Sequence, residues 1–145
     1  MNEKQKIRLA QRYQNFKNMV DVFESEVERF DVESFSVLET MGVAKCFELA
    51  FELLWKLFKD YLTLQEVDID VISPKPIIRQ IATVGLLGKM KVDGDLLLDM
   101  HKNRNNLVHV YDKAEAKEIV ATIKNDYIHE FKKVADFFEE YLHDN

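Results

Sequence analysis

The chain has 145 residues, enough for one domain that buries a core without disulfide bonds or a structural metal. Hydrophobic residues make up 47% of it and charged residues 32%, and only four Gly and two Pro are available for turns, which favours long helices over a many-stranded sheet. The formal charge of −6 argues against a protein that binds nucleic acid over its whole surface, because such proteins are usually basic. We therefore expect one all-α domain over residues 1–145.

Short features of the sequence disfavour several classes of protein. The single Cys46 cannot form a disulfide bond within the chain, has no partner for a metal site, and is expected to pack as a small buried hydrophobe. The N-terminus is polar and runs into an amphipathic pattern rather than a signal peptide, and no stretch approaches the ~18 uninterrupted apolar residues of a membrane span. We expect a cytoplasmic protein with no membrane association and no metal or other cofactor.

A first helix is predicted from about residue 3 to residue 30. Its apolar residues recur at alternating steps of four and three, which places them along one face of a helix. They are Leu9, Tyr13, Phe16, Val20, Phe23, Val27 and Phe30. Such a seam fits packing inside a bundle or against a partner helix. A short connection over 31–36 follows, in which Ser34 or Ser36 could cap the next helix.

The second predicted helix, about 36–63, is the most apolar part of the chain. Its polar positions Lys45, Glu48, Glu52 and Lys56 recur at steps of three and four, which leaves one narrow hydrated stripe. A helix that is apolar on most of its circumference is expected in the middle of a bundle or against a second subunit. Glu48 and Glu52 lie one turn apart, and a solvated stripe is favoured over metal ligation because no His-x-x-Glu spacing accompanies them.

A short third helix follows an extended connection over 64–72. We expect Ser73 to cap this helix, Pro74 to occupy its first turn, and Gly85 to end it. Residues 86–94 are predicted to form a loop, and Asp93 or Asp95 can cap the fourth helix that comes next.

A fifth helix begins at a capping-box pattern, in which Glu115 follows Asp112 by three residues. Its inner face again shows apolar residues at steps of three and four. They are Val120, Ile123, Tyr127, Phe131, Val134, Phe138 and Tyr141. Together these elements predict a helical bundle of four substantial helices and one short helix.

The segment between the fourth and fifth helices gathers side chains that suit phosphate chemistry. Arg104 and Asn105 lie about one turn before His109, and Asn105 and His109, four apart, can share a helix face. Tyr111 directly precedes the cap at Asp112 and therefore lies at the helix junction. From 101 to 113 the chain is locally basic, opposite to its overall charge.

Arginine and histidine are the groups that metal-independent RNA cleavage requires. A guanidinium can bind two phosphate oxygens and stabilise the negative charge of a transition state, and an imidazole can act as general acid or base near neutral pH. The plain structural alternative is that Arg104 bonds to the last carbonyls of its helix, as arginines near helix C-termini do.

Three motifs in order make the chain resemble a known family. Arg104, followed by Asn105, His109 and Tyr111, resembles the R-N-x-x-x-H-x-Y signature of HEPN proteins that are paired with minimal nucleotidyltransferases. The run KCFELAFELLWK at 45–56 resembles the K-x-F-E-L-x-x-E-x-x-W-K run of the nucleotidyltransferase substrate-binding branch. The S-P-x-x-x-x-R pattern at 73–79 resembles that branch's third-helix start. One departure is the run of three Leu at 96–98, where the family often has an aromatic residue.

The resemblance implies a fold, a partner and roles for the site residues. The implied fold is an up-and-down four-helix bundle with an additional short helix, which forms a homodimer with the motif near its two-fold axis. The implied partner is a minimal nucleotidyltransferase, which acts as the antitoxin of a toxin–antitoxin pair. In that arrangement Arg104, His109 and Asn105 serve a metal-independent endoribonuclease, and adenylylation of Tyr111 silences it. An alternative that the sequence leaves open is a non-catalytic module that presents a nucleotide or substrate to the transferase, and a purely structural bundle is a third possibility.

Overall fold

The computed structural model describes residues 2–107 and 112–144, and within them every regular element is a helix. The α-helices are α1 (Glu3–Phe23), α2 (Val37–Leu64), α3 (Pro74–Thr83), α4 (Leu86–Met90), α5 (Gly94–Leu107), α6 (Lys113–Thr122) and α7 (Ile128–Asp144). Two π-helical segments extend this set, Glu24–Glu28 after α1 and Ile123–Tyr127 between α6 and α7, and a single 3-10 turn spans Val32–Ser34. The predicted all-α fold is confirmed.

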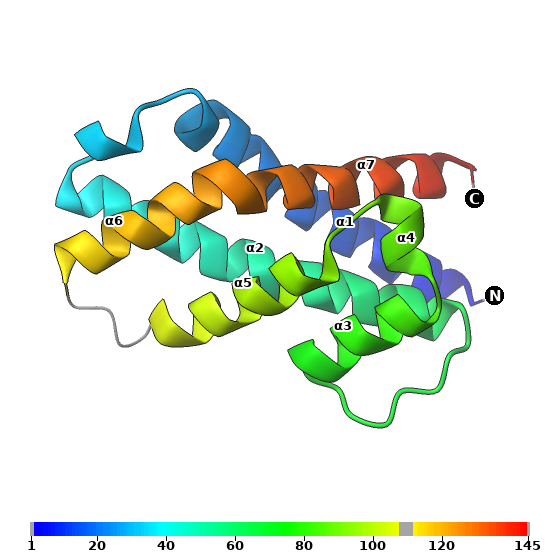
Figure 1. The fold of residues 1–145 in the computed structure, drawn as a ribbon. Helices are drawn as coiled ribbons and strands as arrows, with labels where there is room; N and C mark the ends of the chain where they lie inside the picture. Colours follow the sequence, from blue (N-terminus) through cyan, green and yellow to red (C-terminus); the bar gives the residue numbers. More distant parts are fainter. Residues whose placement is uncertain (1, 108–111, 145) are drawn as a thin grey trace.

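The long helices lie lengthwise beside one another and run in alternating directions (Figure 1). Helix α1 packs against α2 and α7, α2 also contacts α3, α5 and α6, and the two chain ends lie at the same end of the molecule. The short helices α3 and α4 lie at that end as well, beside the start of α5 (Figure 1). The arrangement is the up-and-down bundle that the sequence predicts.

Helix α2 occupies the middle of the bundle, as its apolar circumference predicts. Its buried side chains are Thr40, Val43, Phe47, Ala50, Phe51, Leu54, Trp55, Leu57, Phe58, Asp60, Leu62 and Leu64. Buried aromatic rings of other helices pack against it: the Phe47 ring is 5.4 Å from Tyr127 and 6.2 Å from Phe131, measured between centroids. Phe131 in turn contacts Phe16 and Phe23 of α1. This aromatic cluster joins the three longest elements of the bundle.

The predicted seam of the first helix is buried from Leu9 to Val27, but its last member is not. Phe30 is 51% exposed, so the prediction that it belongs to the core is wrong. The reason is that the helix ends before this residue: the π-helical segment stops at Glu28, and Phe30 no longer lies on a helix face. The chain then turns at residues 29–30.

Three of the predicted helix starts are confirmed by hydrogen bonds. The Ser36 Oγ accepts from the Glu39 N–H at 3.1 Å while the Glu39 carboxylate accepts from the Ser36 N–H at 2.9 Å, a complete capping box for α2. Asp93 begins α5 by accepting from the Asp95 N–H at 2.9 Å. The side chain of Asp112 accepts from the Ala114 N–H at 2.8 Å and caps α6 in the same way.

Two details of the third helix and the loop after it differ from expectation. The Ser73 side chain makes no capping hydrogen bond, and one of the two usual donors is missing because the third helical residue is Pro76, which lacks an N–H. The predicted loop over 86–94 contains the short helix α4. It forms because Leu86 and Met90, one turn apart, are both buried, and Gly85 in the left-handed conformation (φ 83°) separates it from α3.

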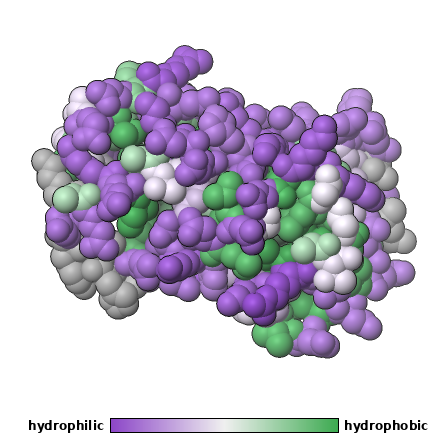
Figure 2. All heavy atoms as spheres, in the orientation of Figure 1, coloured by the Kyte–Doolittle hydropathy of each residue, from purple (hydrophilic) through white to green (hydrophobic). Residues whose placement is uncertain are grey.

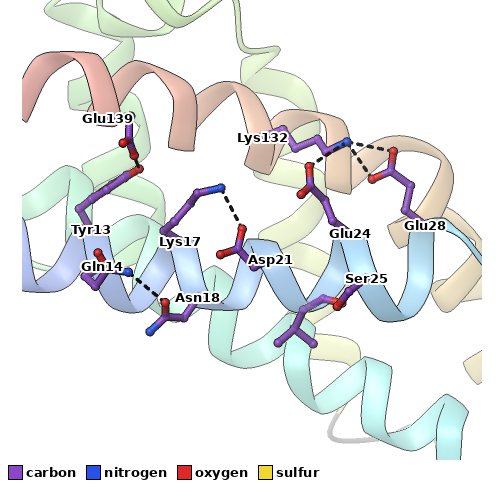
Figure 3. Close-up of polar contacts among 11 residues, drawn as sticks. Tyr13, Gln14, Lys17, Asn18, Asp21, Glu24, Ser25, Glu28, Lys132 and Glu139 are labelled. Carbon is purple, nitrogen blue, oxygen red and sulfur yellow. Dashed lines mark hydrogen bonds and ion pairs between the residues drawn. The ribbon is translucent and has the colours of Figure 1, made fainter. Parts of the chain in front are cut away.

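Ion pairs connect α1 and the π-helical segment after it to neighbouring helices along the outside of the bundle (Figure 3). The Lys132 ammonium of α7 lies between two carboxylates of the π-helical segment, 3.3 Å from Glu24 and 2.8 Å from Glu28. On the other side of α1 the Arg12 guanidinium pairs with the buried Asp60 of α2 at 2.9 Å. These pairs satisfy charges close to the core.

The outer surface is mainly hydrophilic. In the orientation of Figure 1, hydrophobic residues are gathered over the half of the molecule that holds α3, α4 and the start of α5 (Figure 2). Across the described part of the chain, none of the helices combines the length and apolar character needed to cross a bilayer.

Replacing Phe131 with Ala should lower the free energy of unfolding by about 3–5 kcal/mol, because the ring is fully buried among Phe16, Phe23 and Phe47. The same substitution at the exposed Phe30 should cost about 0.5 kcal/mol or less. Urea denaturation followed by circular dichroism measures both. Equal losses at the two positions would contradict the assignment of Phe30 to the surface.

Candidate functional site

The candidate site is built on the last turns of α5, whose position is set by a buried tyrosine of the neighbouring helix. The Tyr127 hydroxyl donates to the Asp99 carboxylate at 2.5 Å and accepts from the Asn103 amide at 2.6 Å. Burial, together with the hydrogen bond to Asp99, raises the pKa of Tyr127 well above its usual value, so the phenol stays protonated and keeps donating. These bonds fix the turn of α5 immediately before Arg104.

Arg104 faces α2. Its Nη1 is 3.0 Å from Glu52 Oε2, and its guanidinium carbon lies 5.6 Å from the centre of the Phe51 ring. The Arg104 Nε is buried and makes no hydrogen bond with any described residue. The predicted phosphate-binding arginine is therefore held against the second helix, and the alternative in which it caps the carbonyls of its own helix has no hydrogen bond to support it within the described residues.

The Glu52 carboxylate binds three donor groups, two from α2 and one from α5. The same Oε2 that binds Arg104 accepts from the Trp55 indole N–H at 3.0 Å, and Oε1 lies 3.2 Å from the Lys56 ammonium. Partial burial raises the pKa of the Glu52 carboxyl, but hydrogen bonds from Trp55 and Lys56 and the positive charges of Lys56 and Arg104 outweigh it and hold the pKa below its usual value. Glu52 is thus a charged, hydrogen-bonded member of the polar stripe that the sequence predicts on this helix, and its side chain is 37% exposed.

A groove runs along this junction between α2 and α5. It has a volume of about 550 Å³, and its lining residues are Lys45, Glu48, Leu49, Glu52, Arg104 and Asn105. A smaller hollow of about 240 Å³ continues it toward α6 and shares Lys45 and Glu48 with it. Lys45 pairs with Glu48 at 3.3 Å, so the groove offers cations, carboxylates, an amide and one apolar side chain.

Asn105 contacts a histidine that the sequence did not single out. Its Nδ2 is 3.3 Å from the Nε2 of His101, one turn earlier on α5, and the imidazole stacks on Phe51 with 6.0 Å between ring centres. Burial lowers the pKa of His101, and the positive charges of Arg104 and Lys75 lower it further, which favours the neutral ring that can accept from the amide. The i,i+4 spacing of the two residues was the available signal.

The other two predicted site residues, His109 and Tyr111, lie outside the described residues. The predicted pairing of Asn105 with His109 therefore stays a prediction. Of the predicted site residues, the described structure brings Arg104 and Asn105 together in one groove. It adds Glu52, Trp55 and His101, and within the described ranges it contains no cluster of three His, Cys, Asp or Glu side chains placed to hold a metal ion.

Substituting Arg104 with Met should raise the pKa of His101 toward its ordinary value of 6.5, because one of the positive charges that oppose protonation is removed. Titration of the imidazole resonances by NMR measures this shift. Lys17→Met, which removes a cation of α1, is the matched control and should leave the His101 titration curve in place. A curve unmoved by Arg104→Met would mean that the two side chains are not neighbours in solution.

Comparison with known proteins adds the family to this geometry. A family model described as "Nucleotidyltransferase substrate binding protein like" matches residues 11–140, which run from within α1 through most of α7 and include the whole candidate site. No individually curated protein gives a significant match. The family supports association with a nucleotidyltransferase, in agreement with the resemblance carried by the three motifs. The chain belongs to the nucleotidyltransferase substrate binding protein-like family.

Proposed function

We propose that the chain is the HEPN partner of a minimal nucleotidyltransferase and that it is a metal-independent endoribonuclease, the toxin of a toxin–antitoxin pair. Arg104 binds the scissile phosphate and stabilises its added negative charge, and His109 transfers the proton. Asn105 orients His109 or the substrate, and Tyr111 is the residue that the partner modifies with AMP.

The position of Arg104 in the groove between α2 and α5 carries this proposal. The guanidinium uses Nη1 to bind Glu52 and retains further N–H donors, so it can bind a phosphate oxygen while it stays anchored. The groove volume of about 550 Å³ is in the range of sites that bind nucleotide-sized ligands. Asn105 and Lys45 add an amide and an ammonium on the same walls.

The proposed reaction uses the RNA's own 2′-hydroxyl. A general base removes the proton of that hydroxyl, the oxygen attacks the adjacent phosphorus, and the bond to the 5′-oxygen breaks as that oxygen receives a proton. The products are a 2′,3′-cyclic phosphate and a free 5′-hydroxyl. A two-fold homodimer would bring two copies of Arg104 and His109 together, so that one imidazole could act as base and the other as acid.

A surface on α2 supports self-association. The first half of this helix exposes large apolar side chains, with Leu38 79% exposed and Met41 61% exposed. Large apolar side chains that are exposed close together are typical of a surface that another chain covers. It lies beside the groove, because Met41 lines the hollow that continues from Lys45.

Modification of Tyr111 accounts for silencing. An attached AMP would place negative charge and bulk near the segment that begins with Arg104, where it would compete with the phosphate of RNA. The partner, which holds the nucleotide, would therefore act as the antitoxin.

The second candidate function is a non-catalytic module that binds a nucleotide or substrate and presents it to the transferase. The mixed charge of the groove favours this candidate, because Glu48 and Glu52 stand beside the cations and disfavour a long phosphate backbone. A compact ligand with one phosphate group would avoid both carboxylates more easily.

Incubation of the purified chain with tRNA in EDTA separates the two candidates. The wild-type chain should cleave, and His109→Ala should reduce cleavage at least about a hundredfold while circular dichroism and light scattering show an unchanged fold and dimer. Cleavage by His109→Ala at the wild-type rate would remove His109 from the mechanism. An intact tRNA that nevertheless binds the wild-type chain would favour the presenting module.

A further inference from the structure

We propose that Glu52 is a positioning residue for Arg104: its carboxylate holds the guanidinium in the groove in the orientation in which a phosphate group is bound. The inference rests on the proposed function for the consequence in RNA cleavage, and on the contacts of α2 and α5 for the positioning itself. The two parts can therefore be tested separately.

The first support is the isolation of the Arg104 guanidinium from other acceptors. In the part of the chain that the structure describes, Glu52 is the residue that accepts a hydrogen bond from it, at 3.0 Å, and the contact joins two helices across 52 positions of sequence. The Phe51 ring, 5.6 Å away, supports one face of the guanidinium without fixing its rotation. Among the described residues, Glu52 supplies the directional contact of this long and flexible side chain, which is only 25% exposed.

The second support is that Glu52 is itself held on both oxygens. Oε2 accepts from the indole of Trp55, which is buried and cannot rotate freely, and Oε1 is bound by Lys56. An acceptor that is fixed in this way transmits its position to the donor that binds it. The Arg104 side chain is therefore oriented before a ligand binds, so binding loses less side-chain conformational entropy.

The third support is a contrast with the neighbouring carboxylate. Glu48 lies one turn earlier on the same helix and lines the same groove, but its ion pair is with Lys45, at 3.3 Å. Two carboxylates in one groove therefore have different contacts, and Glu52 is the one bound to the arginine. Glu48 supplies a matched control for the positioning.

The ordering of Arg104 can be measured without RNA. In ¹⁵N-labelled protein the Arg104 Nε–H resonance is identified by its disappearance in Arg104→Lys, and its heteronuclear NOE reports mobility. The NOE should be high in the wild type and in Glu48→Gln, and lower in Glu52→Gln, in which the loss of the negative charge weakens the bond to Arg104 although the amide oxygen can still accept a hydrogen bond. Glu52→Asp, which keeps the charge on a shorter side chain, gives a second variant if Glu52→Gln does not fold. An NOE as high in the Glu52 variants as in the wild type overturns the proposal.

The functional consequence is measured by the cleavage of tRNA in EDTA. Glu52→Gln should lower kcat about a hundredfold, the effect expected when a binding group is displaced by about 1 Å. Asp21→Asn, which removes a paired carboxylate of α1, should leave cleavage unchanged. The double variant Glu52→Gln/Arg104→Lys should be no slower than Arg104→Lys alone, because a residue that acts through Arg104 has no effect once Arg104 is replaced.

The outcomes distinguish the two proposals. Additive losses in the double variant, or faster cleavage by Glu52→Gln, would mean that Glu52 does not position Arg104 but acts independently or competes with the phosphate. A wild-type chain that leaves tRNA intact, together with an NOE that falls in Glu52→Gln, would overturn the nuclease and retain the positioning.

Discussion

Burial of α2 is the constraint on which the other elements depend. From Ala50 onward this helix is apolar on almost all sides, and such a helix is stable only when neighbours surround it, as α1, α3, α5 and α6 do here. The polar groups that α2 carries into this environment need partners. Asp60 forms an ion pair with Arg12 of α1, and Glu52 forms one with Arg104 of α5.

The groove lies along the boundary between the exposed and the buried side of α2. Leu49 lines the groove and is 47% exposed, whereas Phe47, Ala50 and Phe51 are fully buried. At this boundary a charged side chain is close enough to the core to be fixed and close enough to solvent to reach a ligand. The hydrogen bonds between Tyr127 and two residues of α5, Asp99 and Asn103, hold α5 so that Arg104 lies at this boundary. The contact between Arg104 and Glu52 therefore depends on the packing that buries α2.

The sequence predicted well what depends on periodicity and local caps, and less well what depends on packing between distant segments. The seams of the long helices and the caps at Ser36 and Asp112 follow from spacing alone. The exposure of Phe30 does not, because the apolar spacing continues beyond Glu28, where the helix ends. Helix α4 was missed because five residues carry too little periodic signal. In the site, Arg104 and Asn105 were predicted from their types, their spacing and the family resemblance. The contact between Arg104 and Glu52 was not, because the two residues are 52 positions apart and no local pattern encodes that contact.

We propose that the groove between α2 and α5 binds the phosphate of a ribonucleotide. Mapping of the NMR chemical shifts that change when an RNA is added tests this proposal. A 2′-O-methyl RNA oligonucleotide is suitable, because it lacks the free 2′-hydroxyl and cannot be cleaved during the titration. We expect the resonances of Lys45, Arg104 and Asn105 to shift in a saturable and salt-dependent manner, while those of Ile7 and Leu142 at the other end of the bundle stay in place. Shifts confined to another face, or none at all, would contradict it.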